Sequence, residues 1–111
     1  MTTALLSVYR KDGIIEFAKQ LEELGWKILA SGGTAKTLTE AGISVRDIAE
    51  IVGEPILGHR VVTLSREIHA GLLARDCQED QDELKQLGIP WIDLVCVDFY
   101  PLEEEIKKPI R

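Results

Sequence analysis

Short apolar runs alternate with amphipathic segments along this chain. Residues 4–9 and 26–30 form two mostly apolar runs, as expected of strands that are covered on both faces. The segment between them carries apolar residues at helical spacing: Ile14, Phe17, Ala18, Leu21 and Leu24. Gly25 follows, at a position typical of the glycine that ends a helix. Because a strand–helix–strand unit of this size has parallel strands and a right-handed crossover, the pattern predicts an α/β fold.

The rest of the chain continues this alternation. It predicts a second helix over 34–41 that stops at Gly42, a short strand over 43–45, one helical turn or more in 47–52, a loop over 53–60 and a brief strand over 61–64. Ser65 is an N-cap candidate for the next helix, and a polar surface helix over 79–87 has Leu84 and Leu87 as inward-facing candidates. The β-prone run 92–99 is expected to be a central strand, followed by a last helix over 102–108. We therefore expect a three-layer, Rossmann-like parallel sheet of about five strands flanked by helices, in a single domain over residues 1–111.

Composition and charge restrict the classes of function. The chain has 19 acidic and 13 basic residues and a net charge of −6, which opposes general binding to nucleic acid or to an anionic membrane surface. Cys77 and Cys96 have neither the spacing nor the partners of a metal site, so no metal is expected. No stretch is long and apolar enough to cross a membrane, and the first residues lack the basic start of a secretory signal. These features predict a cytoplasmic protein.

Three segments that follow predicted strands are expected to share one crevice, because ligands of open parallel sheets bind beyond the carboxyl ends of the strands. They are residues 9–11, the run Ser31-Gly32-Gly33-Thr34 and residues 98–100. The glycines let backbone N–H groups approach a phosphate, the two hydroxyls can donate to it, and Lys11 can neutralise it. The pattern predicts a phosphomonoester site. The alternative is a tight strand-to-helix turn with a threonine cap, since the spacing is neither that of a Walker loop nor that of GxGxxG.

Several polar residues leave two interpretations open. Three arginines flank a polar loop of this acidic chain: Arg60, Arg66 and Arg75. Arg60 with Thr63 adds anion contacts, or these arginines are solvated surface charge. His69 is a general acid or base, or it is a helix-packing residue. Tyr100 hydrogen-bonds a ligand, or it packs with its hydroxyl in water.

A set of motifs spread over most of the chain carries a family resemblance. They are Ser7-Val8 with Lys11 and Gly13, then residues 31–35, 45–47, 58–64 and 68–74, and finally residues 93–95 leading to Tyr100-Pro101. In order and spacing these motifs resemble the methylglyoxal-synthase-like domain that forms the IMP cyclohydrolase half of the bifunctional purine-biosynthesis protein family. The resemblance runs from Leu5 to about Glu104.

This resemblance implies a function and a set of site residues. The family closes the purine ring of formylated aminoimidazolecarboxamide ribonucleotide with loss of water, which gives IMP, and it uses no metal or organic cofactor. By resemblance, the chain binds a nucleoside monophosphate and forms a homodimer. The residues that match the family's 5′-phosphate cradle are Lys11, Ser31, Gly32, Gly33, Thr34, Arg60 and Thr63. Tyr100 matches the catalytic tyrosine beside the reacting base, in a reaction that depends mostly on positioning and electrostatic stabilisation.

The chain also departs from the family's motifs. Val62 stands where the family's Arg-Val-Lys-Thr-Leu-His-Pro motif has an active-site lysine, and a valine cannot hydrogen-bond or stabilise charge. The other replacements are Ser65-Arg66 for the His-Pro pair, Tyr9-Arg10 for Ser-Asp, and Asp98 for the asparagine of the tyrosine motif. The family's later Asp-Ile-Gly-Gly segment has no match up to Arg111, so the chain is expected to lack the C-terminal part of the family's domain.

Three functions are therefore compared. The first is an IMP-cyclohydrolase-like domain that binds a ribonucleotide 5′-phosphate and whose chemistry is impaired. The second is a non-catalytic phosphate-binding or regulatory module of the same fold, similar to the domain at the end of the carbamoyl-phosphate synthetase large subunit. The third is methylglyoxal synthase itself, which is disfavoured because its paired aspartates and His-rich early segment have no match here.

Overall fold

The fold is built around the strand β1 (Thr3–Ser7), which is paired on both of its edges. The computed structural model describes residues 2–53 and 65–98. The elements that follow β1 are α1 (Ile14–Glu23), β2 (Lys27–Ala30), α2 (Gly32–Glu40), β3 (Arg46–Asp47), α3 (Ala49–Val52), α4 (Arg66–Leu73), α5 (Gln78–Leu87) and β4 (Leu94–Val97). In the described ranges they form one sheet with the strand order β3-β2-β1-β4, and all three strand pairs are parallel.

This arrangement confirms the predicted α/β class. The strand count in the described residues is four, slightly lower than the expected five or so. The predicted strand over 61–64 and the predicted helix over 102–108 lie outside the described residues, as does most of the predicted loop over 53–60.

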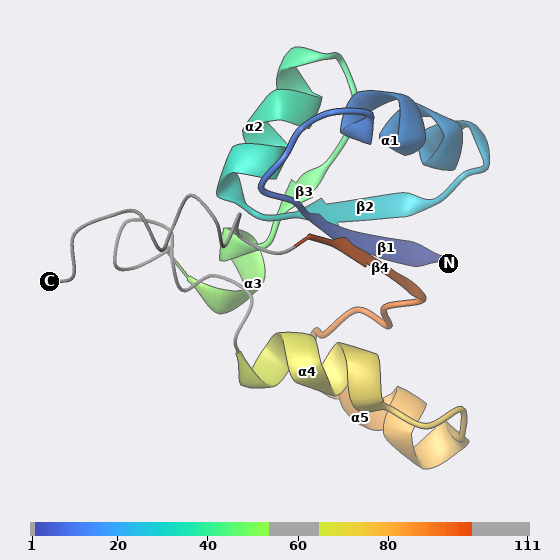
Figure 1. The fold of residues 1–111 in the computed structure, drawn as a ribbon. Coiled ribbons are helices and arrows are strands. Elements are labelled where there is room, and N and C mark those ends of the chain that lie inside the picture. The colour runs from blue at the N-terminus through green and yellow to red at the C-terminus, as the bar shows by residue number, and fades with distance from the viewer. Residues whose placement is uncertain (1, 54–64, 99–111) are drawn as a thin grey trace, which may run out of the picture.

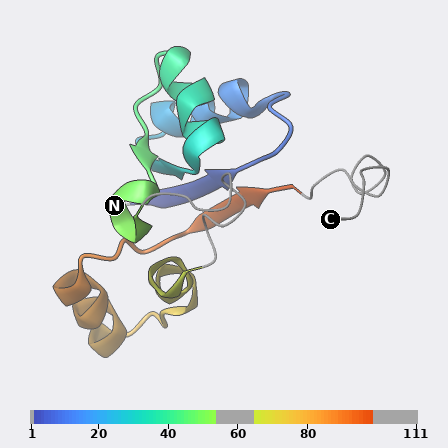
Figure 2. The same cartoon turned by 90° about the vertical axis from the view of Figure 1, so that its left-hand side faces the viewer.

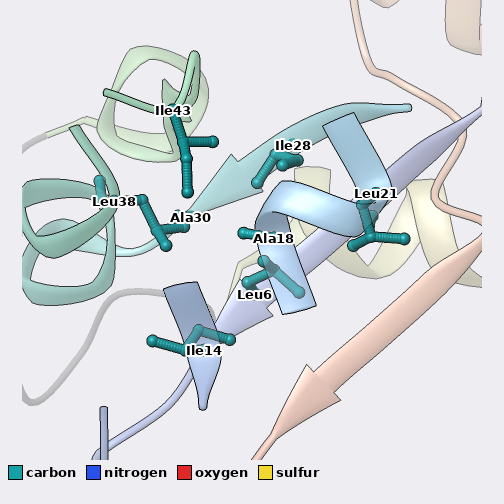
Figure 3. Packing of buried hydrophobic residues seen from close by; sticks show 10 residues of the cluster. Leu6, Ile14, Ala18, Leu21, Ile28, Ala30, Leu38 and Ile43 are labelled. Carbon is teal, nitrogen blue, oxygen red and sulfur yellow. The ribbon is translucent and has the colours of Figure 1, made fainter. Parts of the chain in front are cut away.

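Helices cover both faces of the sheet, as two views of the chain show (Figures 1 and 2). α1 and α2 lie on one face, and α3, α4 and α5 lie on the other. Alternate β1 residues face opposite layers, so Ala4 and Leu6 pack with α1 and α2, whereas Leu5 packs with Ile68 of α4. Figure 3 shows the first of these cores, in which Leu6, Ala18 and Leu38 are completely buried. Burial on both faces explains why β1 has no polar alternation.

The first helix ends as its sequence predicts. Gly25 follows the last turn of α1 with a φ of 83°, in the left-handed region. Its N–H donates to the Glu22 carbonyl, and the Trp26 N–H donates to the Leu21 carbonyl, both at 3.0 Å. These are the two hydrogen bonds of a Schellman motif, and they turn the chain directly into β2.

The third strand begins later than predicted. The prediction placed it over residues 43–45, but β3 is Arg46–Asp47. The Ile43 N–H instead donates to the Leu38 carbonyl in the turn that ends α2, and the Ser44 N–H donates to the Glu22 carboxylate at 2.9 Å. Because both amides are engaged in this way, the chain joins the sheet only at Arg46.

The strand β4 is shorter than predicted, and its expected central position is wrong for the described residues. It covers Leu94–Val97 and pairs with β1 at the end of the strand order. Leu94 and Cys96 pack against the core, whereas Val95 and Val97 are 44% and 60% exposed. A β-branched run is equally compatible with an edge and a central strand, so its composition did not determine its neighbours.

The pair α4 and α5 follows the prediction in part. Ser65 caps α4 as predicted, since its Oγ accepts a hydrogen bond from the Ile68 N–H at 3.1 Å. Arg75, just before α5, donates a side-chain hydrogen bond to Asp80 in the first turn of α5 and lowers the pKa of Asp80 to about 2. On α5, Leu84 is buried as expected, but Leu87 is 60% exposed, so its predicted inward position is wrong. Leu87 ends the helix, where the following Gly88 turns the chain away.

We predict that Gly71→Ala destabilises the fold. A Cβ at this buried position of α4 would lie 2.5 Å from the Pro90 carbonyl oxygen and 3.2 Å from the Ile92 side chain. The backbone must shift to admit it, so we expect a loss of about 1–3 kcal/mol in the free energy of unfolding, measured by urea denaturation. Gly33→Ala is the matched helical control, because its Cβ meets only the Lys11 ammonium at 3.9 Å. Equal stability of the two variants would contradict the predicted close packing.

Candidate functional site

The carboxyl ends of three parallel strands bring together the loop after β1, the start of α2 and Asp98 after β4. The parallel registers place Ser7 beside Val97 and Leu6 beside Ala30, so the segments that follow leave the sheet at the same edge. This is the edge at which open α/β sheets bind ligands.

Thr34 is the buried centre of this arrangement. Its side chain is 1% exposed, and its Oγ1 lies 3.2 Å from the Val8 N–H nitrogen and 3.3 Å from the Val8 carbonyl oxygen. The hydroxyl therefore accepts from one backbone group of Val8 and donates to the other. It also accepts from the Lys11 ammonium at 3.4 Å. One donor and two acceptor positions are all that a hydroxyl has, so Thr34 is saturated.

Lys11 reaches across the loop to the first turn of α2. Its half-buried ammonium donates to the Val8 carbonyl and lies 3.5 Å from the Tyr9 carbonyl. It also faces Gly33, because a Cβ built there would be 3.9 Å from the Lys11 Nζ. A positive charge is thus held next to the N-terminus of a helix, where the helix dipole is also positive.

The N-terminus of α2 has no acidic side chain of its own. Ser31 is the N-cap residue, but its Oγ pairs with the Ser7 Oγ at 2.9 Å and caps no amide. The first hydrogen bond of the helix is from the Ala35 N–H to the Ser31 carbonyl, so the amides of residues 32–34 have no intrahelical acceptor. Acidic residues occupy the first turn of α1, α4 and α5, whereas α2 has none there. The first turn of α2 therefore offers positive potential that no acidic side chain of the same turn offsets.

Asp98 holds the other side of the loop. Its Oδ1 accepts from the Tyr9 N–H at 2.5 Å, and its Oδ2 accepts from the Arg10 N–H at 2.9 Å. Partial loss of hydration acts to raise the pKa of Asp98, but these two amide bonds and the charge of Lys11 outweigh it, so the pKa is lowered. Asp98 is therefore a carboxylate at neutral pH.

The structure brings together five of the predicted site residues, and the other three lie outside the described residues. Lys11, Ser31, Gly32, Gly33 and Thr34 converge at the carboxyl ends of the strands. The prediction placed the two glycines in a tight turn ahead of the helix, but they form the first turn of α2. Glycines are tolerated there because the amides of a first helical turn have no intrahelical acceptor in any helix. Arg60, Thr63 and Tyr100 lie outside the described residues, as does Val62.

Two residues at this edge were missing from the predicted site. Ser7 ends β1 and pairs with Ser31; it was noted only as part of a family motif at the end of an apolar run. Asp98 was expected in the crevice and was noted as a replacement of the family's asparagine, but no hydrogen-bonding role was predicted for it. Its two amide partners are almost ninety residues earlier in the chain, so no local pattern could reveal them.

The remaining candidates lie on the surface. His69 is exposed and donates from Nδ1 to the Ser65 carbonyl at 2.7 Å, so it is not a buried packing residue. Arg66 and Arg75 pair with the nearby acids Glu67 and Asp80, and their side chains are 89% and 74% exposed, as solvated surface charge would be.

Within residues 2–53 and 65–98, no cluster of three or more metal-ligating side chains occurs. Over the same ranges, no helix has the length and apolar character needed to span a membrane.

Comparisons with known proteins agree with the fold. The family model of the MGS-like domain matches residues 13–111. The chain is 50% identical over 107 residues to the bifunctional purine biosynthesis protein PurH of Aquifex aeolicus, and 49% identical over 107 residues to that of Persephonella marina. Each match covers 95% of this chain but only 21% of the relative, so the chain spans about a fifth of those proteins. A crystal structure of ForH matches with a TM-score of 0.76 and 42% identity, over 89% of this chain and 53% of that one.

We predict that Thr34→Val destabilises the protein although it preserves the side-chain shape. The change leaves the Val8 N–H without its hydroxyl acceptor, while the Val8 carbonyl keeps the Lys11 ammonium, so we expect a loss of about 1–3 kcal/mol in the free energy of unfolding. Thr37→Val is the matched control on the same helix, since the Thr37 hydroxyl bonds the Gly33 carbonyl of its own helix. Chemical denaturation of both variants measures the difference. A Thr34→Val protein as stable as the Thr37→Val protein would show that the Thr34 hydroxyl does not hold the loop.

Proposed function

Since the chain belongs to the family of MGS-like domains, we propose that it binds the 5′-phosphate of a purine ribonucleotide in the crevice formed by Lys11 and the start of α2. It is homologous to purine-biosynthesis proteins, and the proposed ligand is a nucleoside monophosphate such as IMP.

One observation carries this proposal, namely that two sources of positive potential meet without an acid between them in the first turn of α2. The Lys11 ammonium faces Gly33, and the amides of residues 32–34, which have no acceptor within the helix, point out of the helix end. The ammonium charge and the positive ends of the amide dipoles repel each other at this distance. A bound phosphate offsets that repulsion by accepting hydrogen bonds from both. A phosphate dianion has the charge and the number of acceptor oxygens that this arrangement needs.

The sequence indicated that the Ser31 and Thr34 hydroxyls donate to the phosphate, and we assign them different roles. The Thr34 hydroxyl is saturated by Val8 and Lys11, so it positions the lysine and does not donate to the ligand. The Ser31 and Ser7 hydroxyls form a pair in which one proton is left over, because each hydroxyl carries a single donor. That remaining proton is available to a phosphate oxygen beside the helix end.

We propose further that cyclohydrolase chemistry is impaired in this chain. The argument rests on Val62, which stands where the resembled family has an active-site lysine. Closure of the purine ring develops negative charge on the formyl oxygen, and an ammonium stabilises such charge strongly in a closed site. A valine supplies no donor. The cradle residues named above do not depend on this position, so binding is expected to persist where turnover is weak.

The alternative is a binding or regulatory module that has the same cradle and no reaction. The same observation favours it, because the described contacts explain the binding of an anion and do not by themselves explain catalysis. Detectable turnover would exclude a module without a reaction, whereas binding without turnover is expected of both possibilities.

We predict that calorimetry detects binding of IMP and, more weakly, of inorganic phosphate. Lys11→Ala removes a charge-assisted contact to the anion, so we expect roughly tenfold lower affinity or worse, and Ser31→Ala should cause a smaller loss. Gly33→Ala should also weaken binding without unfolding the protein, because its methyl group points at the Lys11 ammonium. Lys19→Ala is the control, since Lys19 is an exposed lysine of α1 away from the crevice. Absence of binding to either ligand would refute the proposed function.

We predict that the chain converts formylated aminoimidazolecarboxamide ribonucleotide to IMP at a rate too low to detect above the uncatalysed reaction. The measurement is the appearance of the purine absorbance, with Tyr100→Phe as a background variant because Tyr100 matches the catalytic tyrosine of the resembled family. Turnover that Tyr100→Phe abolishes would show that Val62 does not impair the chemistry. Binding without turnover would agree with the impaired domain and with the binding module alike.

A further inference from the structure

The loop that carries Lys11 is held from both neighbouring strands. On the β2 side, the Thr34 hydroxyl contacts both backbone groups of Val8. On the β4 side, the Asp98 carboxylate accepts from the next two amides, those of Tyr9 and Arg10. Lys11 is the following residue, so three consecutive positions before it are fixed by side chains from elsewhere in the chain.

Asp98 binds these amides as an external anion would. Each carboxylate oxygen takes one N–H, which is the arrangement by which successive backbone amides capture anions. The lowered pKa of Asp98 shows that the loop favours the charged form. Hydrogen bonds between amides and a charged acceptor are stronger than neutral ones, so this contact resists opening of the loop.

We propose that Asp98 is a positioning residue of the phosphate cradle, which holds the loop after β1 so that the Lys11 ammonium stays over the first turn of α2. This inference rests on the proposed function. Its physical basis is preorganisation: a lysine that is already in place loses less conformational entropy when the anion binds. Asp98 contributes to affinity through Lys11, although it carries the same charge sign as the ligand.

The type of residue matters at this position. The resembled family has asparagine here, which offers one acceptor oxygen and one NH₂ group. With the loop as observed, an asparagine satisfies one amide and turns a donor toward the other. The two functions of the carboxylate, its hydrogen bonds and its charge, therefore predict opposite results for Asp98→Asn. Loss of a bond loosens the lysine, whereas removal of a negative charge next to the site favours the anion.

The test combines phosphate affinity with a double-mutant cycle. We expect Asp98→Ala to lower the affinity for IMP by roughly five- to tenfold, and Asp98→Asn to lower it by a smaller factor. In the Lys11→Ala background, Asp98→Ala should have almost no further effect, because the residue through which it acts is gone. Asp12→Asn is the matched control, since it removes the same charge from an exposed position of the same loop. Amide hydrogen exchange of Tyr9 and Arg10 in the ligand-free protein should become faster in Asp98→Ala and stay unchanged in Asp12→Asn.

The outcomes separate the two proposals. If the unaltered chain binds IMP and Lys11→Ala weakens it, but Asp98→Ala does not, the role of Asp98 is refuted and the cradle stands. Tighter binding by Asp98→Asn would likewise overturn it, because charge would then dominate over position. An equal effect of Asp98→Ala with and without Lys11 would mean that Asp98 does not act through the lysine. If the unaltered chain binds no phosphate ligand at all, the proposed function fails and the positioning role fails with it.

Discussion

The parallel pairing of β1 on both of its edges is the constraint on which the rest of the structure depends. The pairing with β2 and β4 fixes one register on each side, and both registers bring the carboxyl ends of the strands to the same edge. Burial of β1 on both faces makes this register costly to change, since a shift of one residue would exchange the side chains of the two cores. The loop after β1, the start of α2 and Asp98 meet only because of it.

The site itself is a balance of charges around one loop. Positive potential from Lys11 and from the α2 amides lies on one side, and the Asp98 carboxylate lies on the other. Thr34, in the first turn of α2, fixes the loop from the opposite side to Asp98 without carrying charge. Side-chain hydrogen bonds therefore hold the loop on both sides, while the amides at the start of α2 have no acceptor among the described side chains. The proposed anion-binding function rests on this asymmetry, because donors without a described side-chain partner lie at the helix end where a ligand can reach them.

Local pattern predicted most of the fold and only part of the site. Periodicity located α1, and the glycine after it formed the expected Schellman motif, because both depend on neighbouring residues alone. The start of β3 was misplaced because the Glu22 carboxylate captures the Ser44 amide, a contact between segments that pattern does not connect. In the site, Lys11 and the 31–34 run were identified from residue type and from their place after strands. Asp98 was placed at the crevice and Ser7 in a family motif, but neither was given its contacts, since their partners are distant in sequence.

The sequence by itself determined the α/β class, the helix ends and the residues from which an anion site can be made, because these follow from local periodicity, from glycine conformation and from side-chain chemistry. Only the tertiary structure decided what each of those residues does. Thr34 was predicted to donate to a phosphate, and the structure shows its buried hydroxyl bonded to both backbone groups of Val8. Asp98 was placed in the crevice as a replacement of the family's asparagine, and the structure shows it bonded to two amides of a distant loop. A hydroxyl or a carboxylate bonds whichever partner the fold brings within reach, so its role is set by strand register and not by its neighbours in the chain.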